Sequence, residues 1–192
     1  MYMQKTSILT ITNQKGGVGK TTSLVNLAAA YANMGKKCLV VDLDYQGNAT
    51  MIFGQEDNAK SQEKHLAAAF KKDLDLSAIR LPTNHKEQSV EWNQHPKKMH
   101  LLKIIFDCPE INEYDFVLID THPSFDCYVQ AALSASHYYL VPLFAESCSV
   151  RGLGHILNQI ESIRKYCNES LYFLGCLITR FDKKNGVHAQ FE

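Results

Sequence analysis

The sequence lacks a surplus of charge of either sign, a long apolar run and any cysteine pair at metal-binding spacing. Twenty Lys and Arg residues balance twenty Asp and Glu residues, so the net charge gives no argument for a nucleic acid or a membrane as partner. No apolar run approaches transmembrane length, and the first residues lack a basic region followed by a signal-length apolar core. We therefore expect a cytoplasmic protein that does not bind a membrane.

The cysteines and histidines are too scattered to indicate a metal cluster. The six cysteines include no CxxC pair and no zinc spacing, and the eight histidines are equally dispersed. Several cysteines lie in apolar segments, where a reduced thiol packs as a small hydrophobe. With 192 residues, of which 45% are hydrophobic, the chain is long enough for one domain with a sizeable core. We predict a single domain over residues 1–192.

Apolar runs rich in β-branched residues alternate with helical patterns along the chain. The runs lie at residues 7–12, 38–44, 114–120, 137–143 and 171–178. After the first run and the glycines that follow it, residues that favour a helix extend as far as Gly35. A second helix is indicated by an apolar face at helical spacing over residues 150–166. This alternation predicts an α/β fold, a doubly wound, mostly parallel sheet with helices on both faces. A polar segment at about 54–112 is less regular, and we expect it to be variable, with short helices at 66–70 and 99–106.

A glycine-rich segment joins the first strand to its helix. It reads Lys15-Gly16-Gly17-Val18-Gly19-Lys20-Thr21-Thr22. Strand, glycine loop and helix in this order predict a phosphate-binding loop, because glycines let backbone N–H groups wrap a phosphate chain at the positive end of the helix. Lys20 would neutralise the β- and γ-phosphates, and the Thr21 hydroxyl would hold Mg²⁺. The alternative is a tight strand-to-helix turn with a chance lysine, which this context disfavours.

Lys15 goes beyond the general motif, because it stands one residue before the paired glycines. A lysine there would lie beside phosphates already held by Lys20, or it would reach the nucleotide of a second molecule. The alternative is a solvated lysine at the end of a strand.

Carboxylates follow two of the predicted strands where ligands gather in such a sheet. Asp42 and Asp44 end the second run, and Asp120 ends the third. Asp120 is the expected partner of Mg²⁺, directly or through water, and Asp42 would support the same metal shell. Asp44 would orient the water that attacks the γ-phosphorus. The alternatives are a helix cap for Asp120 and a polar loop without function for the segment after Asp42.

With these residues assembled, the chain resembles the ParA/MinD family of deviant Walker A P-loop ATPases, and within it the ParA (Soj-like) partition ATPases. The resemblance lies in the glycine loop and in the segments Asp42-Leu43-Asp44-Tyr45-Gln46-Gly47-Asn48-Ala49-Thr50 and Tyr114-Asp115-Phe116-Val117-Leu118-Ile119-Asp120-Thr121-His122-Pro123-Ser124. Later landmarks are Val141-Pro142-Leu143 with Glu146, Gly152-Leu153 and Ile178-Thr179-Arg180-Phe181-Asp182. Together these segments cover roughly residues 6–53 and 112–186.

The resemblance implies a molecular switch driven by ATP and Mg²⁺. It implies a homodimer formed with ATP, in which Lys15 crosses to the partner's phosphates, and slow hydrolysis involving Lys15, Lys20 and Asp44. It also implies a ParB-like DNA-binding partner that stimulates hydrolysis, and binding of the dimer to non-specific DNA. Thr179 and Arg180 are the candidate contacts to the adenine base.

Three features depart from the family pattern. Tyr45 replaces the usual proline, and His122 stands where a small residue or proline is common. Family members also continue beyond the position of Glu192, through parts that usually complete the adenine pocket and carry basic residues for DNA. We therefore expect either a C-terminally shortened member, truncated or unusually short, or one whose DNA contacts lie elsewhere. Two alternatives stay open: a MinD-like positioning ATPase at a membrane, and a dethiobiotin-synthetase-like kinase or ligase.

Overall fold

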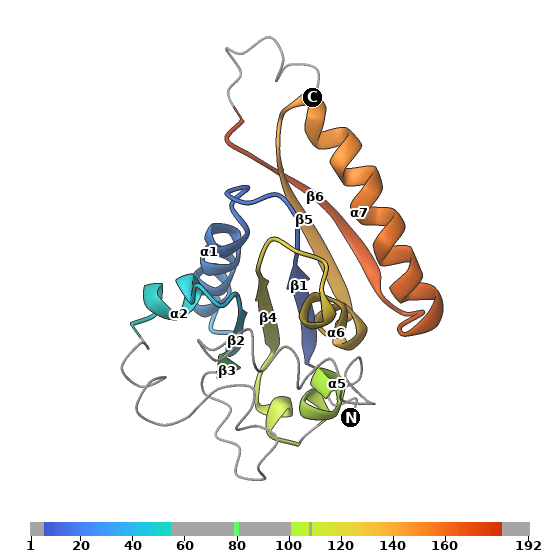
Figure 1. Ribbon diagram of the computed structural model, residues 1–192. Coiled ribbons are helices and arrows are strands. Elements are labelled where there is room, and N and C mark those ends of the chain that lie inside the picture. Colours follow the sequence, from blue (N-terminus) through green and yellow to red (C-terminus); the bar gives the residue numbers. More distant parts are fainter. Residues whose placement is uncertain (1–5, 55–78, 81–100, 108, 182–192) are drawn as a thin grey trace.

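A computed structural model describes residues 6–54, 79–80, 101–107 and 109–181 (Figure 1). Its elements are β1 (Ser7–Ile11), α1 (Lys20–Asn33), β2 (Cys38–Leu43), α2 (Asn48–Ile52), β3 (Ile79–Arg80), α5 (Leu101–Phe106), a 3-10 helix (Pro109–Glu113), β4 (Phe116–Thr121), α6 (Cys127–Ala135), β5 (Tyr138–Phe144), α7 (Ser147–Tyr166) and β6 (Tyr172–Thr179).

The strands form one sheet in the order β3-β2-β4-β1-β5-β6, and every neighbouring pair is parallel. β1 therefore lies inside the sheet, between β4 and β5. The register places Asp120 of β4 beside Ile11 of β1 on one side and beside Asp42 of β2 on the other. Because all strands run the same way, the loops that follow them meet at one edge, where ligands bind in sheets of this kind. The predicted doubly wound α/β fold is confirmed.

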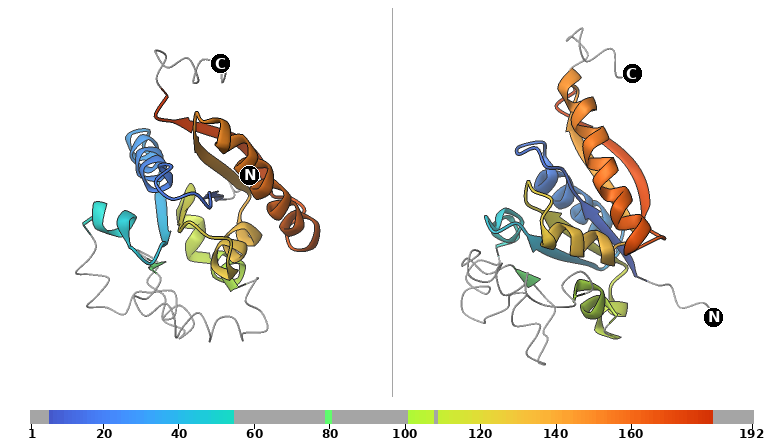
Figure 2. Two further views of the ribbon diagram at one scale, coloured as in Figure 1. Left: turned by 45° about the horizontal axis from the view of Figure 1, so that its top comes forward. Right: turned by 45° about the vertical axis from the view of Figure 1, so that its right-hand side comes forward.

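Helices cover both faces of the sheet, as the continuous apolar strands require (Figures 1 and 2). On one face, α1 and α2 bury a cluster made by Leu9, Ile11, Leu24, Ala28, Ala49 and Leu118. On the other face, α5 and α6 cover β2 and β4. Ile156, Ile160 and Ile163 of α7 pack there against Tyr139 and Val141 of β5. These packed faces hold the strand ends in fixed positions under the loops.

The sequence pattern located five of the strands and both long helices. α1 ends at Asn33, just before Gly35 with its φ of 74°, and α7 begins at Ser147, three residues before the predicted face. α5 lies within the helix predicted at 99–106, whereas the predicted helix at 66–70 lies outside the described residues. Four short elements were not predicted: α2, β3, the 3-10 helix and α6. The single-domain assignment stays a prediction.

No helix within the described ranges is both long enough and apolar enough to cross a bilayer.

Candidate nucleotide-binding site

The glycine loop connects β1 to α1 at the carboxyl edge of the sheet. Gly17 and Gly19 have φ angles of 71° and 88°, in the left-handed region that L side chains rarely adopt. Val18 between them is buried and fixes the loop to the core. α1 begins at Lys20, so its first backbone N–H groups, which have no partner within the helix, face this loop. The loop therefore has the form of a phosphate cradle.

Two polar side chains outside the motif hold the cradle in place. Asn13 donates from Nδ2 to the carbonyl oxygen of Pro142 on β5 at 2.7 Å, and its Oδ1 accepts from the Lys15 N–H at 2.9 Å. The Thr179 hydroxyl, at the end of β6, donates to the carbonyl oxygen of Val18 at 2.9 Å. Asn13 was missed by the sequence reasoning, and its only signal was a polar residue between an apolar strand and the glycines.

Lys20 lies inside the site. It is only 7% exposed, and its Nζ donates to the carbonyl oxygen of Lys15 at 3.3 Å. Burial lowers the pKa of Lys20, while the negative charges of Asp120 and Asp44 partly offset that effect. The Lys20 ammonium group could release the carbonyl oxygen of Lys15 and bind a phosphate oxygen in its place.

Thr21 and Asp120, both predicted at the metal, are in direct contact. The Thr21 hydroxyl donates to Oδ2 of Asp120 at 2.6 Å, and Asp120 is fully buried. Burial raises the pKa of Asp120 to about 7; the charges of Asp42 and Asp44 add to the rise, and Thr21 and Lys20 oppose it. The other oxygen, Oδ1, has no hydrogen-bond partner among the described residues. A buried carboxylate oxygen without a partner beside a threonine hydroxyl fits a hard cation such as Mg²⁺.

Asp42 organises the loop that follows β2. Its Oδ1 accepts from the Asp44 N–H at 3.1 Å, and its Oδ2 accepts from the N–H and the hydroxyl of Thr50 at 2.9 and 2.8 Å. Burial raises the pKa of Asp42, and the hydrogen bonds from Thr50 and Asp44 oppose the rise. The structure thus gives Asp42 a loop-holding function that the sequence reasoning missed, and its contact with a metal stays a prediction.

Asp44 lies at the start of that loop, close to the cradle. It is 7% exposed, its Oδ1 accepts from the Gln46 N–H at 3.0 Å, and its charge acts on both Lys20 and Asp120. Lys20, Thr21, Asp44 and Asp120 are therefore brought together, as the sequence predicted. No three His, Cys, Asp or Glu side chains in the described part of the chain form a metal cage by themselves. A P-loop metal takes its remaining ligands from phosphate and water.

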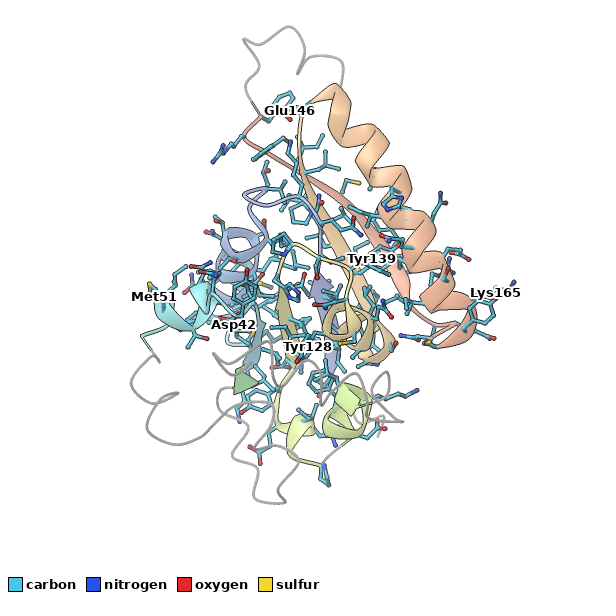
Figure 3. The ribbon with its side chains drawn as sticks, viewed as in Figure 1. Asp42, Met51, Tyr128, Tyr139, Glu146 and Lys165 are labelled. Atoms are coloured by element: carbon cyan, nitrogen blue, oxygen red, sulfur yellow. The ribbon has the colours of Figure 1, made fainter. Side chains whose placement is uncertain are left out.

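Lys15 points away from this cluster, at the outer side of the loop. Its Nζ lies 2.8 Å from Oε2 of Glu146, which Figure 3 shows beyond the end of β5, and the two side chains are 47% and 51% exposed. The same ammonium lies 5.0 Å from the centroid of the Phe144 ring, and the Arg180 guanidinium lies 4.9 Å from that centroid. Lys15 is thus accessible and held only by surface contacts.

The other predicted contacts are at the same edge. Gly16 and Thr22 are exposed on the loop and the first turn of α1. Thr179 contacts the cradle through Val18, and Arg180, at a φ of 53°, is exposed beside Phe144. Contacts of Thr179 and Arg180 with a base stay predictions.

Comparison with known proteins agrees with this geometry. A family profile described as an AAA domain matches residues 6–173. Soj, a sporulation initiation inhibitor protein of Bacillus subtilis, is 33% identical over 197 residues, which cover 95% of this chain and 76% of Soj. The chain belongs to the ParA/MinD family of P-loop proteins, on its ParA (Soj-like) side. The chromosome partitioning protein ParA of Caulobacter vibrioides is 31% identical over 194 residues, covering 95% of this chain and 73% of that protein.

Solved structures share the fold of this family member. Cobyrinic acid a,c-diamide synthase from Mycobacterium smegmatis, with bound ADP and magnesium, has a TM-score of 0.82 at 27% identity, covering 96% of this chain and 79% of the other. A plasmid partition protein from Borrelia burgdorferi has a TM-score of 0.75 at 27% identity, covering 97% of this chain and 83% of the other. The predicted P-loop NTPase fold is confirmed.

Proposed function

We propose that this ParA-family chain is an ATPase that dimerises with ATP and acts as a switch in DNA partition. The observation that carries the proposal is the pair of lysines on one loop: Lys20 is buried beside Asp120 and Asp44, and Lys15 is exposed at the rim. A single nucleotide needs only the first of them. The second is placed to reach a phosphate held by another subunit. Similarity to the chromosome partitioning protein ParA supports a function in DNA partition.

ATP and Mg²⁺ fit the residues that surround the cradle. Backbone N–H groups of the loop and Lys20 would hold the phosphates, and Thr21 with Asp120 would hold the metal, which supplies charge stabilisation at the γ-phosphate. The Asp44 carboxylate would accept a hydrogen bond from water and orient it for attack. Asp42 would keep Asp44 in place through the loop that it organises. The Mycobacterium smegmatis enzyme, solved with ADP and magnesium and with an ATP analogue and magnesium, supports this choice of ligands.

Lys15 must leave Glu146 before it can cross to a second molecule. An ion pair between two half-exposed side chains contributes only about 0–1 kcal/mol. A phosphate that approaches from a partner subunit offers more negative charge and several acceptors, so it would replace Glu146. Hydrolysis would then remove the bridging γ-phosphate and favour separation of the subunits. The dimer would bind non-specific DNA and respond to a ParB-like DNA-binding partner.

Sedimentation tests the role of Lys15. With ATP and Mg²⁺, and with turnover blocked by Asp44→Ala, we expect the protein to sediment as a dimer, and Lys15→Ala to weaken dimerisation by about tenfold or more, as loss of a charge-assisted contact does. Lys36 offers a matched control. It is also a partly exposed lysine in an ion pair, with Asp115, but it lies after α1, away from the carboxyl edge. Lys36→Ala should dimerise normally, and a protein that is monomeric in every nucleotide state contradicts the proposal.

Substitutions inside the cradle should separate binding from turnover. Lys20→Ala should abolish ATP binding, because it removes the only buried cation at the predicted phosphate position among the described residues. Asp44→Ala should keep binding and dimerisation but slow hydrolysis by about 10²–10³-fold, the usual cost of losing one such catalytic group. Equilibrium binding of a fluorescent ATP analogue and single-turnover phosphate release measure the two effects. If Asp44→Ala hydrolyses ATP at the normal rate, the role given to Asp44 is wrong.

A second candidate function comes from the solved neighbour that is named as a synthase. A ligase on this fold would use ATP to activate a small acceptor in place of water. Such an enzyme releases little phosphate until its acceptor is added. Steady phosphate release by the purified chain with Mg-ATP alone would exclude it.

A further inference from the structure

His122 is buried between the carboxyl ends of β2 and β4, where the predicted catalytic and metal-binding carboxylates lie. It is 4% exposed and follows β4, two residues after Asp120. Its Nδ1 lies 3.2 Å from the carbonyl oxygen of Leu43, the last residue of β2. Its Nε2 lies 2.7 Å from Oδ2 of Asp126, in front of α6. The His122 ring thus connects the end of β2 to the start of α6.

The atoms involved fix the direction of the hydrogen bond to Leu43. A carbonyl oxygen can only accept, so Nδ1 of His122 donates to Leu43. Asp126 is fixed independently, because its Oδ1 accepts from the N–H groups of Tyr128 and Val129 at 3.1 and 3.3 Å and caps α6. The ring is therefore held firmly at its α6 side and presents a donor to the end of β2.

Both chain neighbours of Asp44 contact this ring. Leu43 accepts its hydrogen bond, and the Tyr45 ring lies edge-on to it with centroids 6.0 Å apart. On the other side, Asp44 is restrained by Asp42 and Gln46. The position of the Asp44 carboxylate relative to Asp120 is then set by two restraints, the loop hydrogen bonds and the His122 ring.

We infer that His122 is a positioning residue for Asp44, which it holds by clamping the end of β2 to the loop after β4. The inference rests on the proposed function, because Asp44 has a catalytic role only there. The clamp also links both loops to α6, so movement of one loop at the nucleotide is passed to the other. A misplacement of a catalytic group by about 1 Å can cost up to about 10²-fold in rate.

Two conservative substitutions separate the two ends of the clamp. In His122→Asn the amide nitrogen takes the place of Nδ1 and can still donate to Leu43. In His122→Gln it takes the place of Nε2, which lies near Asp126 and 2.8 Å from Oγ of Ser124, and it does not reach Leu43. We expect His122→Ala and His122→Gln to lower the hydrolysis rate by about tenfold with Mg-ATP affinity within about twofold, and His122→Asn to keep most of the rate. A His122→Ala protein that folds and hydrolyses at the wild-type rate overturns the inference.

His137→Ala is the matched control. Its Nδ1 accepts from the Ile8 N–H at 3.1 Å, near the start of β1 and at the other edge of the sheet. Its loss should lower thermal stability and leave the hydrolysis rate per folded molecule unchanged. If His137→Ala slows hydrolysis as much as His122→Ala does, the effect of His122 is merely structural, and the inference fails.

Two further measurements distinguish a failure of the inference from a folding defect and from a failure of the proposed function. In an Asp44→Ala background, His122→Ala should change the residual single-turnover rate by less than about twofold, since a positioning residue has nothing left to position. In the nucleotide-free protein, amide exchange at residues 44–47 should rise in His122→Ala and stay low in His122→Asn. Unchanged amide exchange in His122→Ala refutes the clamp. A wild-type chain that does not hydrolyse ATP refutes the proposed function, whatever the exchange measurement shows.

Discussion

Asp120 is a residue of the site whose ionised form is strongly disfavoured. It is fully buried beside two other carboxylates, Asp42 and Asp44, and only Thr21 and Lys20 favour its ionised form. Ionisation of Asp120 in the absence of a metal is therefore costly, and its pKa is about 7. A bound divalent cation removes that cost. If Asp120 holds the metal as predicted, it would link the affinity for the metal to the stability of the nucleotide-free protein.

The pH dependence of stability should reveal this cost directly. Because the pKa of Asp120 is raised from 3.8 to about 7, the folded protein binds more protons than the unfolded chain between those pH values, and stability falls as pH rises through that window. Asp120→Asn removes the charge. Without nucleotide or Mg²⁺, it should be more stable than the wild type at pH 8 by roughly 2–4 kcal/mol, with the difference shrinking toward pH 4.

Denaturant unfolding across this pH range measures the difference. Asp115→Asn is the control, and it should lower stability where Asp120→Asn raises it. The backbone N–H of Lys37 lowers the pKa of Asp115, so the ionised form of Asp115 stabilises the fold above the unfolded pKa. Equal stability of Asp120→Asn and wild type at pH 8 would contradict the buried, unpartnered state of this carboxylate.

At the scale of elements, the sequence predicted what apolar periodicity and glycine placement control. The five longer strands and α7 follow from continuous apolar runs and a 3.6-residue face. β3 has only two residues, and α6 is apolar on nearly all sides, so neither shows a period. In the candidate site, the motif predicted the grouping of Lys20 and Thr21 with Asp120. The hydrogen bonds of Asn13 and Asp42 depend on tertiary contacts, which no local pattern encodes.

The turn from β1 into α1 should be sensitive to a side chain at one glycine. Gly19 has a φ of 88°, and a Cβ there would lie 3.4 Å from Cγ2 of Thr179, so Gly19→Ala should destabilise the fold by about 1 kcal/mol or more. Gly16 is the matched control, because a Cβ there meets nothing within 4 Å. Thermal unfolding of the two variants should show a loss for Gly19→Ala only. Equal melting temperatures would show that the loop does not require this conformation.

At the scale of the whole molecule, the parallel sheet brings the glycine loop, the Asp44 loop, the His122 loop and the Glu146 turn to one edge. Lys15 is an exposed cation of the glycine loop at that edge, so the phosphates of a second subunit could reach it. In the proposed dimer, two such edges face each other across the nucleotides. DNA affinity should then depend on nucleotide state, because only the dimer presents the basic residues of both subunits together.

An electrophoretic shift on unrelated duplex DNA tests the proposed partition function most directly. The protein is compared with Mg-ATP, with Mg-ADP and without nucleotide, at one fixed salt concentration, alongside Lys15→Ala and the control Lys36→Ala. We expect a shift with Mg-ATP only, retained by Lys36→Ala and lost by Lys15→Ala. A shift of equal size in all three nucleotide states, or none in any of them, would contradict the proposal.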